Sequence, residues 1–219
     1  TVERRLGSIQ LGQRVGRPEP GDETTTALMT RVRATQLGVL RWSEAATSLR
    51  ERVAFLHRSL GAPWPDWSTG HLIDTVDEWL APYLPGAIGR SDLERLDVAM
   101  VLRSQLPWEV GAELDEVAPA SLTLPSGRSV PIDYAGEQPD AFVRVQDLFG
   151  VTEHPVAGGV PIRLHLLSPA DRPIQVTADL PGFWAGSWTD VKKDMAGRYP
   201  KHQWPDDPAN ADPKRMKDR

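Results

Sequence analysis

The residues best suited to chemistry gather near the C-terminus of the 219-residue chain. All five lysines fall within the last thirty residues, around a run rich in aromatic residues and prolines at 197–208. Lysine and arginine can hold phosphates, while aromatic rings can stack on unpaired bases. The candidate residues for nucleic-acid contacts are Lys192, Lys193, Arg198, Tyr199, Lys201 and Trp204.

Two other interpretations of this C-terminal run stay open. Trp204 and the prolines could dock into an apolar groove on a partner protein. Alternatively, the run could be structural and wrap over the rest of the chain. Just upstream, Trp184 and Trp188 are four residues apart and could share one helix face. We expect Phe183 and Trp184 to belong to the core and to hold the last helix in place.

The distribution of charge restricts where nucleic acid could bind. The formal net charge is −5, but from Val191 onward eight basic residues face five acidic ones. The first 190 residues hold 17 basic residues, all arginine, and 25 acidic residues. An acidic body argues against non-specific binding by the whole surface and leaves room for a local basic patch.

The sequence lacks the motifs of several enzyme classes. It has no cysteine, which excludes disulfides, thiol catalysis and thiolate metal sites. It has no Gly-x-x-x-x-Gly-Lys-Ser/Thr loop, the motif that cradles nucleotide phosphates. The five histidines show no metal-ligand spacing. We therefore expect no metal, no cofactor and no ATP hydrolysis by this chain.

One short segment partly matches a helicase motif. Gln13 to Arg17 matches the first half of a Gln-Arg-x-Gly-Arg-x-Gly-Arg segment, whose arginines stabilise charge on a nucleotide γ-phosphate. The second half of the motif is missing, because Pro18-Glu19-Pro20 follows. We interpret the string as a loop after an edge strand.

The hydropathy and the first residues of the sequence indicate what kind of protein it could come from. It contains no apolar run of eighteen or more residues, so no membrane span is expected. Its first residues, Thr-Val-Glu-Arg-Arg, lack an initiator Met and an apolar signal segment, which favours a piece of a longer protein. The absence of cysteine fits a cytoplasmic location.

The hydrophobic periodicity divides the chain into three regions. Residues 1–22 are expected to end a preceding accessory β domain, with one short strand over 6–11 and a linker. Residues 23–118 show helical spacing, with Ser43 and Ser68 as N-caps, Gly61 as a stop and a capping box over 91–94. In the helix after that box, Leu93, Leu96 and Met100 are expected on the inward face.

The pattern changes at Pro119 to the alternation of strands. Residues 121–134 predict a hairpin around a Pro-Ser-Gly turn, and 141–146, 160–167 and 173–177 predict three more strands. A helix over 180–197 follows. The expected fold class is α+β: a helical region, then at 119–219 a small antiparallel β-barrel-like (OB-like) region with a C-terminal helix and an extended tail.

The order of short motifs along the chain resembles one protein family. The run Gly-Arg-Tyr-Pro-Lys-His-Gln-Trp-Pro-Asp-Asp-Pro at 197–208 is similar to the C-terminal signature of HrpB-type helicases, which are bacterial DEAH-box ATP-dependent RNA helicases. Gln203 departs from the family, which often has proline there. Further similar segments lie at 77–84, 93–97, 122–127, 132–134, 145–150, 155–159, 164–169, 173–177, 180–184 and 191–195.

This resemblance implies that the chain is the C-terminal part of such a helicase. The parent would bind ATP and Mg²⁺ through domains outside this sequence, and no ATPase residue of the family maps onto it. Two functions follow as expectations. The chain could be an accessory domain that guides single-stranded RNA or braces the helicase core, or a module that docks another cellular protein or that core.

Overall fold

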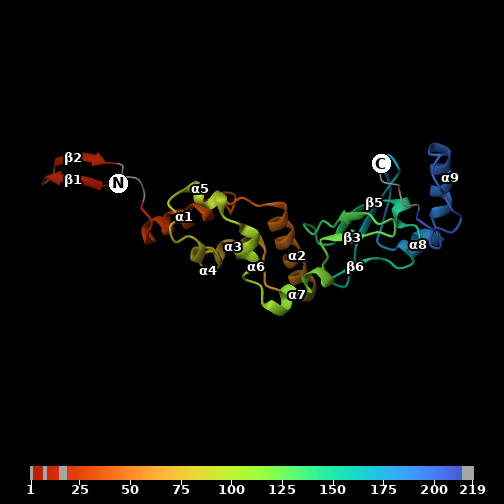
Figure 1. Cartoon of the computed structure of the whole chain (residues 1–219), viewed down its shortest axis with the longest axis horizontal. Helices are drawn as coiled ribbons and strands as arrows, with labels where there is room; N and C mark the ends of the chain where they lie inside the picture. Colours follow the sequence, from red (N-terminus) through yellow and green to blue (C-terminus); the bar gives the residue numbers. More distant parts are fainter. Residues whose placement is uncertain (1, 7–8, 15–18, 214–219) are drawn as a thin grey trace. The chain divides into compact units, whose positions relative to one another are not determined.

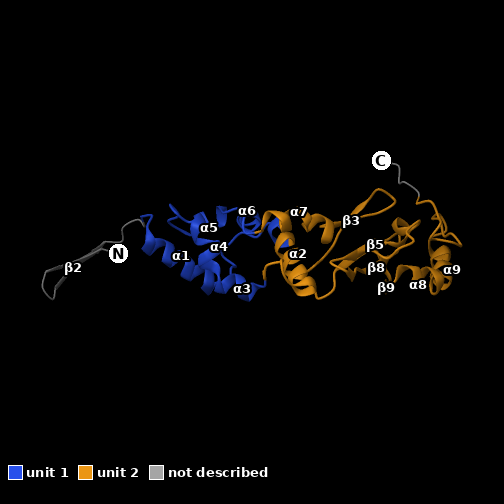
Figure 2. Ribbon diagram, turned by 90° about the horizontal axis from the view of Figure 1, so that it is seen from below, with its two compact units in different colours: residues 1–47, 68–105 blue, residues 48–67, 106–219 orange. Residues whose placement is uncertain are grey.

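The computed structural model describes residues 2–6, 9–14 and 19–213. They fall into two compact units, which Figure 2 distinguishes by colour. Unit 1 comprises residues 1–47 and 68–105, and unit 2 comprises residues 48–67 and 106–219. The helix α2 (Glu44–Leu60) contributes its first turn to unit 1 and the rest to unit 2.

Unit 1 begins with a two-stranded antiparallel hairpin instead of one strand over 6–11. Its strands are β1 (Val2–Leu6) and β2 (Ile9–Arg14), labelled in Figure 1. The prediction was wrong because it placed residues 6–11 in one strand, although the sequence has a Gly-Ser pair at 7–8. Such a pair between two strand-like runs is a hairpin signal. Gln13 and Arg14 of the motif-like string lie in β2, and residues 15–17 lie outside the described residues.

Helices form the rest of unit 1. They are α1 (Asp22–Ala34), α3 (Thr69–Asp74), α4 (Val76–Trp79), α5 (Arg90–Arg95) and α6 (Val98–Arg103), with a 3₁₀ turn, η1 (Ala81–Tyr83). As predicted, Ser68 caps α3, where its Oγ accepts a hydrogen bond from the His71 N–H at 3.3 Å. Trp79 is buried and donates from its indole N–H to the Leu72 carbonyl at 2.8 Å.

The predicted capping box over 91–94 is wrong by two residues. The carboxylate of Asp92 accepts hydrogen bonds from the N–H groups of Ile88 and Gly89, at 2.8 and 3.0 Å. Helix α5 therefore begins directly after Gly89. It ends at Arg95, and Asp97 caps the separate helix α6 through the Met100 N–H at 3.1 Å. This break turns Met100 outward, with 49% of its surface exposed.

In unit 2, the helices α2 and α7 precede small sheets. Helix α2 starts after Ser43, whose Oγ accepts from the Ala46 N–H at 3.2 Å, and it ends at Gly61, which adopts a left-handed φ of 72°. Both boundaries confirm the prediction. Helix α7 (Trp108–Val117) ends against α2. The buried Arg52 of α2 donates to the carbonyls of Leu114 and Ala118 at 3.1 and 2.5 Å.

The strands after α7 form three separate sheets. The predicted hairpin is present as β3 (Ser121–Thr123) and β4 (Ser129–Pro131). A second pair joins β6 (Val156–Ala157) to β7 (Val160–Pro161). The largest sheet has the order β5-β8-β9, with β5 (Asp140–Arg144), β8 (Arg163–Leu167) and β9 (Pro173–Thr177).

No barrel closes among the strands that the structure describes. The expected all-antiparallel arrangement is also wrong, because β5 pairs with β8 in parallel, although β3–β4, β6–β7 and β8–β9 are antiparallel. A parallel pair needs a long crossover, and here residues 145–162 supply it, including the 3₁₀ turn η2 (Val145–Leu148) and the β6–β7 hairpin. The coarser expectation, an α+β fold with helices before small sheets, agrees with the structure.

The predicted last helix consists of two helices, α8 (Leu180–Ala185) and α9 (Trp188–Arg198). Asp179 caps α8 by accepting from the Gly182 N–H at 2.9 Å. The break at Gly186 and Ser187 places Trp184 and Trp188 on different helices, so they do not share one helix face. Their rings meet edge to face at 5.4 Å.

Candidate nucleic-acid interface

The helices α8 and α9 enclose an aromatic cluster in unit 2. Phe149, Phe183, Trp184 and Trp188 are all buried, with ring centroids 5.0 to 6.3 Å apart in tilted or edge-to-face pairs. The predicted core positions of Phe183 and Trp184 are confirmed. These rings stabilise the fold and are not available to stack on bases.

The residues after α9, which we call the tail segment (199–213), fold back onto this cluster. The ring of Trp204 lies 6.1 Å from that of Trp188. The Trp188 indole N–H donates to the Pro205 carbonyl at 2.9 Å, and the Trp204 indole N–H donates to the Tyr199 carbonyl at 3.0 Å. Further along, the Gly150 N–H donates to the Pro208 carbonyl at 2.9 Å. The tail segment is thus fastened at several points.

The candidate cations fall into two groups. Lys192 pairs with Asp206 of the tail segment, and Arg198 pairs with Asp194 one turn earlier on α9 at 3.1 Å. Lys193 and Lys201 are exposed, and neither has an ion-pair partner in the part of the chain that the structure describes. Only these two candidates therefore present a cation without an acidic partner there.

Tyr199 and Trp204 are half-buried, so their rings are partly covered by the protein itself. The Tyr199 hydroxyl lies 3.3 Å from the Ser168 hydroxyl, after the end of β8. Together with the contacts of Trp204, this arrangement agrees with the structural interpretation of the run at 197–208. It leaves less ring surface for bases than the sequence suggested.

A pocket of about 320 Å³ opens between α8 and the tail segment. Trp184, Pro181 and Pro208 contribute apolar lining, and Asp206 and Asp207 contribute carboxylates. The hydrogen bond from Lys192 holds the pKa of the Asp206 carboxyl below its usual value, so Asp206 is ionised at neutral pH. Lys192 offsets the charge of Asp206, but no cation pairs with Asp207 among the described residues, so the remaining negative charge argues against this pocket as a phosphate site.

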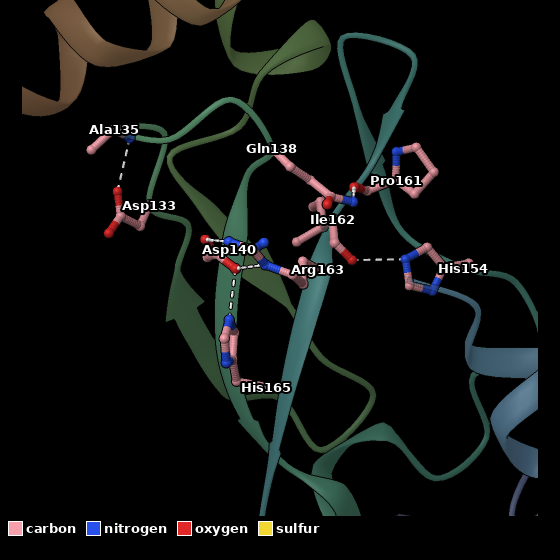
Figure 3. Close-up of polar contacts among 9 residues, drawn as sticks. All are labelled: Asp133, Ala135, Gln138, Asp140, His154, Pro161, Ile162, Arg163 and His165. Carbon is pink, nitrogen blue, oxygen red and sulfur yellow. Dashed lines mark hydrogen bonds and ion pairs between the residues drawn. The ribbon is translucent and has the colours of Figure 1, made fainter. Parts of the chain in front are cut away.

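A second polar cluster lies on the β5–β8 pair (Figure 3). Asp140 accepts two hydrogen bonds from Arg163, both at 2.6 Å, and one from the His165 ring at 2.6 Å. These bonds hold the pKa of Asp140 below its usual value, and the bonds from Arg163 have the largest effect. The sequence analysis missed this cluster. The alternation of Arg163 and His165 with buried leucines marked a polar face, but nothing in the sequence paired it with Asp140.

His154 joins the crossover to α8, and Figure 3 shows its contact with Ile162. Its Nδ1 accepts a hydrogen bond from the Leu180 N–H at 3.0 Å, so Nε2 carries the proton and donates to the Ile162 carbonyl at 2.7 Å. This use of both nitrogens is structural.

Among the described residues no group of three histidine or acidic side chains is arranged to bind a metal ion. No helix there is long and apolar enough to cross a membrane.

Comparison with known proteins identifies the family. A family model described as "ATP-dependent helicase C-terminal" matches residues 79–208, more than half of the chain. The chain belongs to this HrpB C-terminal family. It is 39% identical over 216 residues to the ATP-dependent RNA helicase HrpB of Escherichia coli K12, a match that covers 94% of this chain and 27% of the relative.

Two solved structures of E. coli HrpB resemble this HrpB C-terminal chain. The structure described as a DExH-box NTPase matches with a TM-score of 0.84 and 38% identity, over 97% of this chain and 27% of that one. The structure described as a DEAH/RHA helicase matches with a TM-score of 0.70 and 34% identity, over 92% and 26%. The chain thus spans about a quarter of the length of the proteins it matches.

The docking of the tail segment gives a first testable prediction. Replacing Trp204 with alanine removes the ring contact with Trp188 and the bond that closes the tail segment back on Tyr199, so we expect the free energy of opening the segment to fall by about 1–2 kcal/mol. Trypsin should then cleave after Lys201 roughly 5- to 30-fold faster, measured by mass spectrometry. Trp108→Ala is the control, because Trp108 is 83% exposed. Equal cleavage rates in Trp204→Ala and the wild type would contradict the docking.

Proposed function

We propose that this chain is the C-terminal accessory region of an ATP-dependent RNA helicase, which guides single-stranded RNA without hydrolysing ATP itself. The observation that carries the proposal is the 39% identity to a protein named as an ATP-dependent RNA helicase, over almost all of this chain. The chain lacks the phosphate-binding loop. For the whole helicase we therefore propose that it binds ATP and Mg²⁺ and lies in the cytoplasm. Its core would be the partner of this region.

The geometry of α9 supports guiding as the role. The bonds that fasten the tail segment hold Lys201 near its anchored residues Tyr199 and Trp204, while Lys193 projects from the same helix as Trp188. Cations on a rigid frame lose little entropy when they bind phosphates. We therefore retain Lys193 and Lys201 as the principal phosphate contacts. Lys192, Arg198, Tyr199 and Trp204 are secondary, because each already has a partner within the chain.

The salt dependence of RNA binding tests this role. We expect Lys193→Glu combined with Lys201→Glu to reduce the slope of log K against log salt by about 0.7 for each phosphate that the variant no longer neutralises. Fluorescence anisotropy with a labelled single-stranded RNA, titrated from low to moderate salt, measures the slope. Arg41→Glu combined with Arg103→Glu is the matched control, since it changes net charge equally at two other exposed residues.

Three outcomes separate the alternatives. A reduced slope in the lysine variant alone supports guiding through α9 and the tail segment. Equal effects in both variants would show that only overall charge matters. Absence of RNA binding by the intact chain at low salt would exclude guiding and leave two roles, bracing of the helicase core and docking of a protein partner.

A second candidate function is docking of a protein partner. Trp108 is 83% exposed at the start of α7, and that helix carries four acidic residues. Exposed tryptophans are enriched among the residues that dominate protein interfaces. A partner, either another protein or the helicase core, would shield this ring, and a blue shift of tryptophan fluorescence that is lost in Trp108→Ala would support it.

A further inference from the structure

One face of the β5-β8-β9 sheet carries a row of exposed side chains. The strand register sets Phe142 opposite His165 and His165 opposite Val176. Phe142 is 57% exposed and Val176 is 51% exposed. The alternate residues Ala141, Val143, Leu164 and Leu166 point to the opposite face and are buried. The sheet therefore holds two exposed apolar side chains at its surface, with the half-buried imidazole of His165 between them.

The two rings of this row are parallel and fixed. The Phe142 and His165 rings stack with centroids 4.3 Å apart and planes inclined by 17°. The hydrogen bond to Asp140 at 2.6 Å holds the His165 ring, and Arg163 in turn holds Asp140. A pre-oriented flat surface binds another flat ring without first losing side-chain entropy.

Arginines lie on either side of this row on the same face. Residues 140, 142 and 144 share one face of β5, because side chains alternate along a strand. On this face Phe142 lies between Asp140 and Arg144. Arg144 donates two hydrogen bonds to Asp171 at 2.7 Å, as Arg163 does to Asp140. Each pair uses two of the five guanidinium N–H groups, so donors remain for a further acceptor.

This composition fits a single-stranded nucleic acid better than a protein surface. The cores of protein interfaces are depleted of charged residues, whereas here the apolar row is narrow and flanked by charged pairs. Sites for unpaired bases combine one or two aromatic rings with nearby cations. The guanidinium groups complement phosphate, and the exposed side of Phe142 complements a base.

We infer that the Phe142–His165 face is a stacking site for an unpaired base of single-stranded RNA, with Arg144 and Arg163 beside the adjoining phosphates. This inference rests on the proposed function and adds a binding surface separate from Lys193 and Lys201. No covalent step is involved. The carboxylates beside the arginines keep the face nearly neutral, so stacking contributes more here than charge does.

The test uses the intact chain and a fluorescein-labelled 12-nucleotide oligouridylate, with affinity measured by anisotropy at several salt concentrations. Phe142→Ala should weaken binding about 5- to 150-fold, the range for loss of one stacked base. The salt slope should not change, because no phosphate contact is removed. Phe142→Trp should keep or increase the affinity, and Phe142→Leu, which is apolar but not aromatic, should resemble Phe142→Ala.

Controls distinguish this inference from the proposed function. Trp108→Ala removes a more exposed aromatic residue elsewhere and should leave RNA affinity unchanged. Circular dichroism checks that each variant is folded. If the intact chain binds RNA and both Phe142→Ala and Phe142→Leu bind it as tightly as the wild type, the stacking site is wrong and the proposed function stands. If Phe142→Leu keeps the wild-type affinity while Phe142→Ala loses it, an apolar contact explains the binding and the stacking site is wrong. If the intact chain binds no RNA, both proposals fail.

Discussion

Replacing Arg52 with methionine is expected to lower the free energy of unfolding of unit 2 by about 2–3 kcal/mol. Arg52 is buried on α2, and its guanidinium donates to two carbonyls, Leu114 and Ala118, at the end of α7. The Leu114 carbonyl also accepts the Ala118 N–H at 3.0 Å, whereas the Ala118 carbonyl at the helix end has no donor other than Arg52 among the described residues. Methionine fills a similar volume but donates nothing, so the Ala118 carbonyl loses its hydrogen bond and the Leu114 carbonyl keeps only the bond from the Ala118 N–H.

Arg52 also pairs with Asp115, whose side chain is exposed. The Asp115 side chain is already largely in water, so the expected loss comes mainly from the Ala118 carbonyl. Arg52→Lys should recover part of the stability, because an ammonium keeps the charge but cannot reach all the acceptors at once.

Urea denaturation followed by tryptophan fluorescence measures the change in unfolding free energy. Arg172→Met is the matched control, since Arg172 is exposed in the turn before β9 and should change stability by less than about 0.5 kcal/mol. A loss of less than about 1 kcal/mol in Arg52→Met would refute the helix-end role of this arginine.

Replacing Gly158 with alanine should cost about 2–4 kcal/mol. Gly158 lies between β6 and β7 and has a φ of 53°, a left-handed conformation that strains residues with a Cβ. A Cβ there would lie 2.9 Å from Leu56 Cδ2 and 3.1 Å from Phe55 Cε1. Both side chains are fully buried in α2, so they have little room to move.

Gly159 separates the two causes of this expected loss. Its φ of 74° is also left-handed, but an added Cβ would meet no atom within 4 Å. Gly159→Ala should therefore cost only about 1–2 kcal/mol, the conformational part. The difference between the two variants, measured by the same urea titration, gives the contribution of close packing between the hairpin and α2. Equal losses would show that this packing contributes nothing.

The local boundaries of many elements could be predicted because they depend on residues near in the sequence. Ser43, Gly61 and Ser68 mark helix ends in the sequence and in the structure, since caps and left-handed stops act within one turn. The strand at 173–177 was also predicted with its observed bounds. The family resemblance carried by the ordered motifs was confirmed over residues 79–208. The three-region division at 22 and 118 remains a prediction.

Helix breaks were harder to predict, because competing caps lie within one apolar periodicity. Leu93, Leu96 and Met100 keep helical spacing, yet Asp97 can cap a new helix through its own side chain, and it does so. Likewise, Gly186 interrupts the aromatic run of Phe183, Trp184 and Trp188 without changing its apolar pattern. Periodicity indicates which residues are apolar on one side, but it does not show where the backbone turns.

The sequence by itself determined the helical and strand-forming regions, the family, and the absence of a phosphate-binding loop. Only the tertiary structure decided which strands pair and which charges are neutralised. The parallel β5–β8 pairing brings Asp140 to Arg163 and His165, 23 and 25 residues away. The fold-back of the tail segment gives Lys192 its partner Asp206. The physical reason is that periodicity and caps act between neighbours, whereas ion pairs and ring stacks depend on residues that folding brings together.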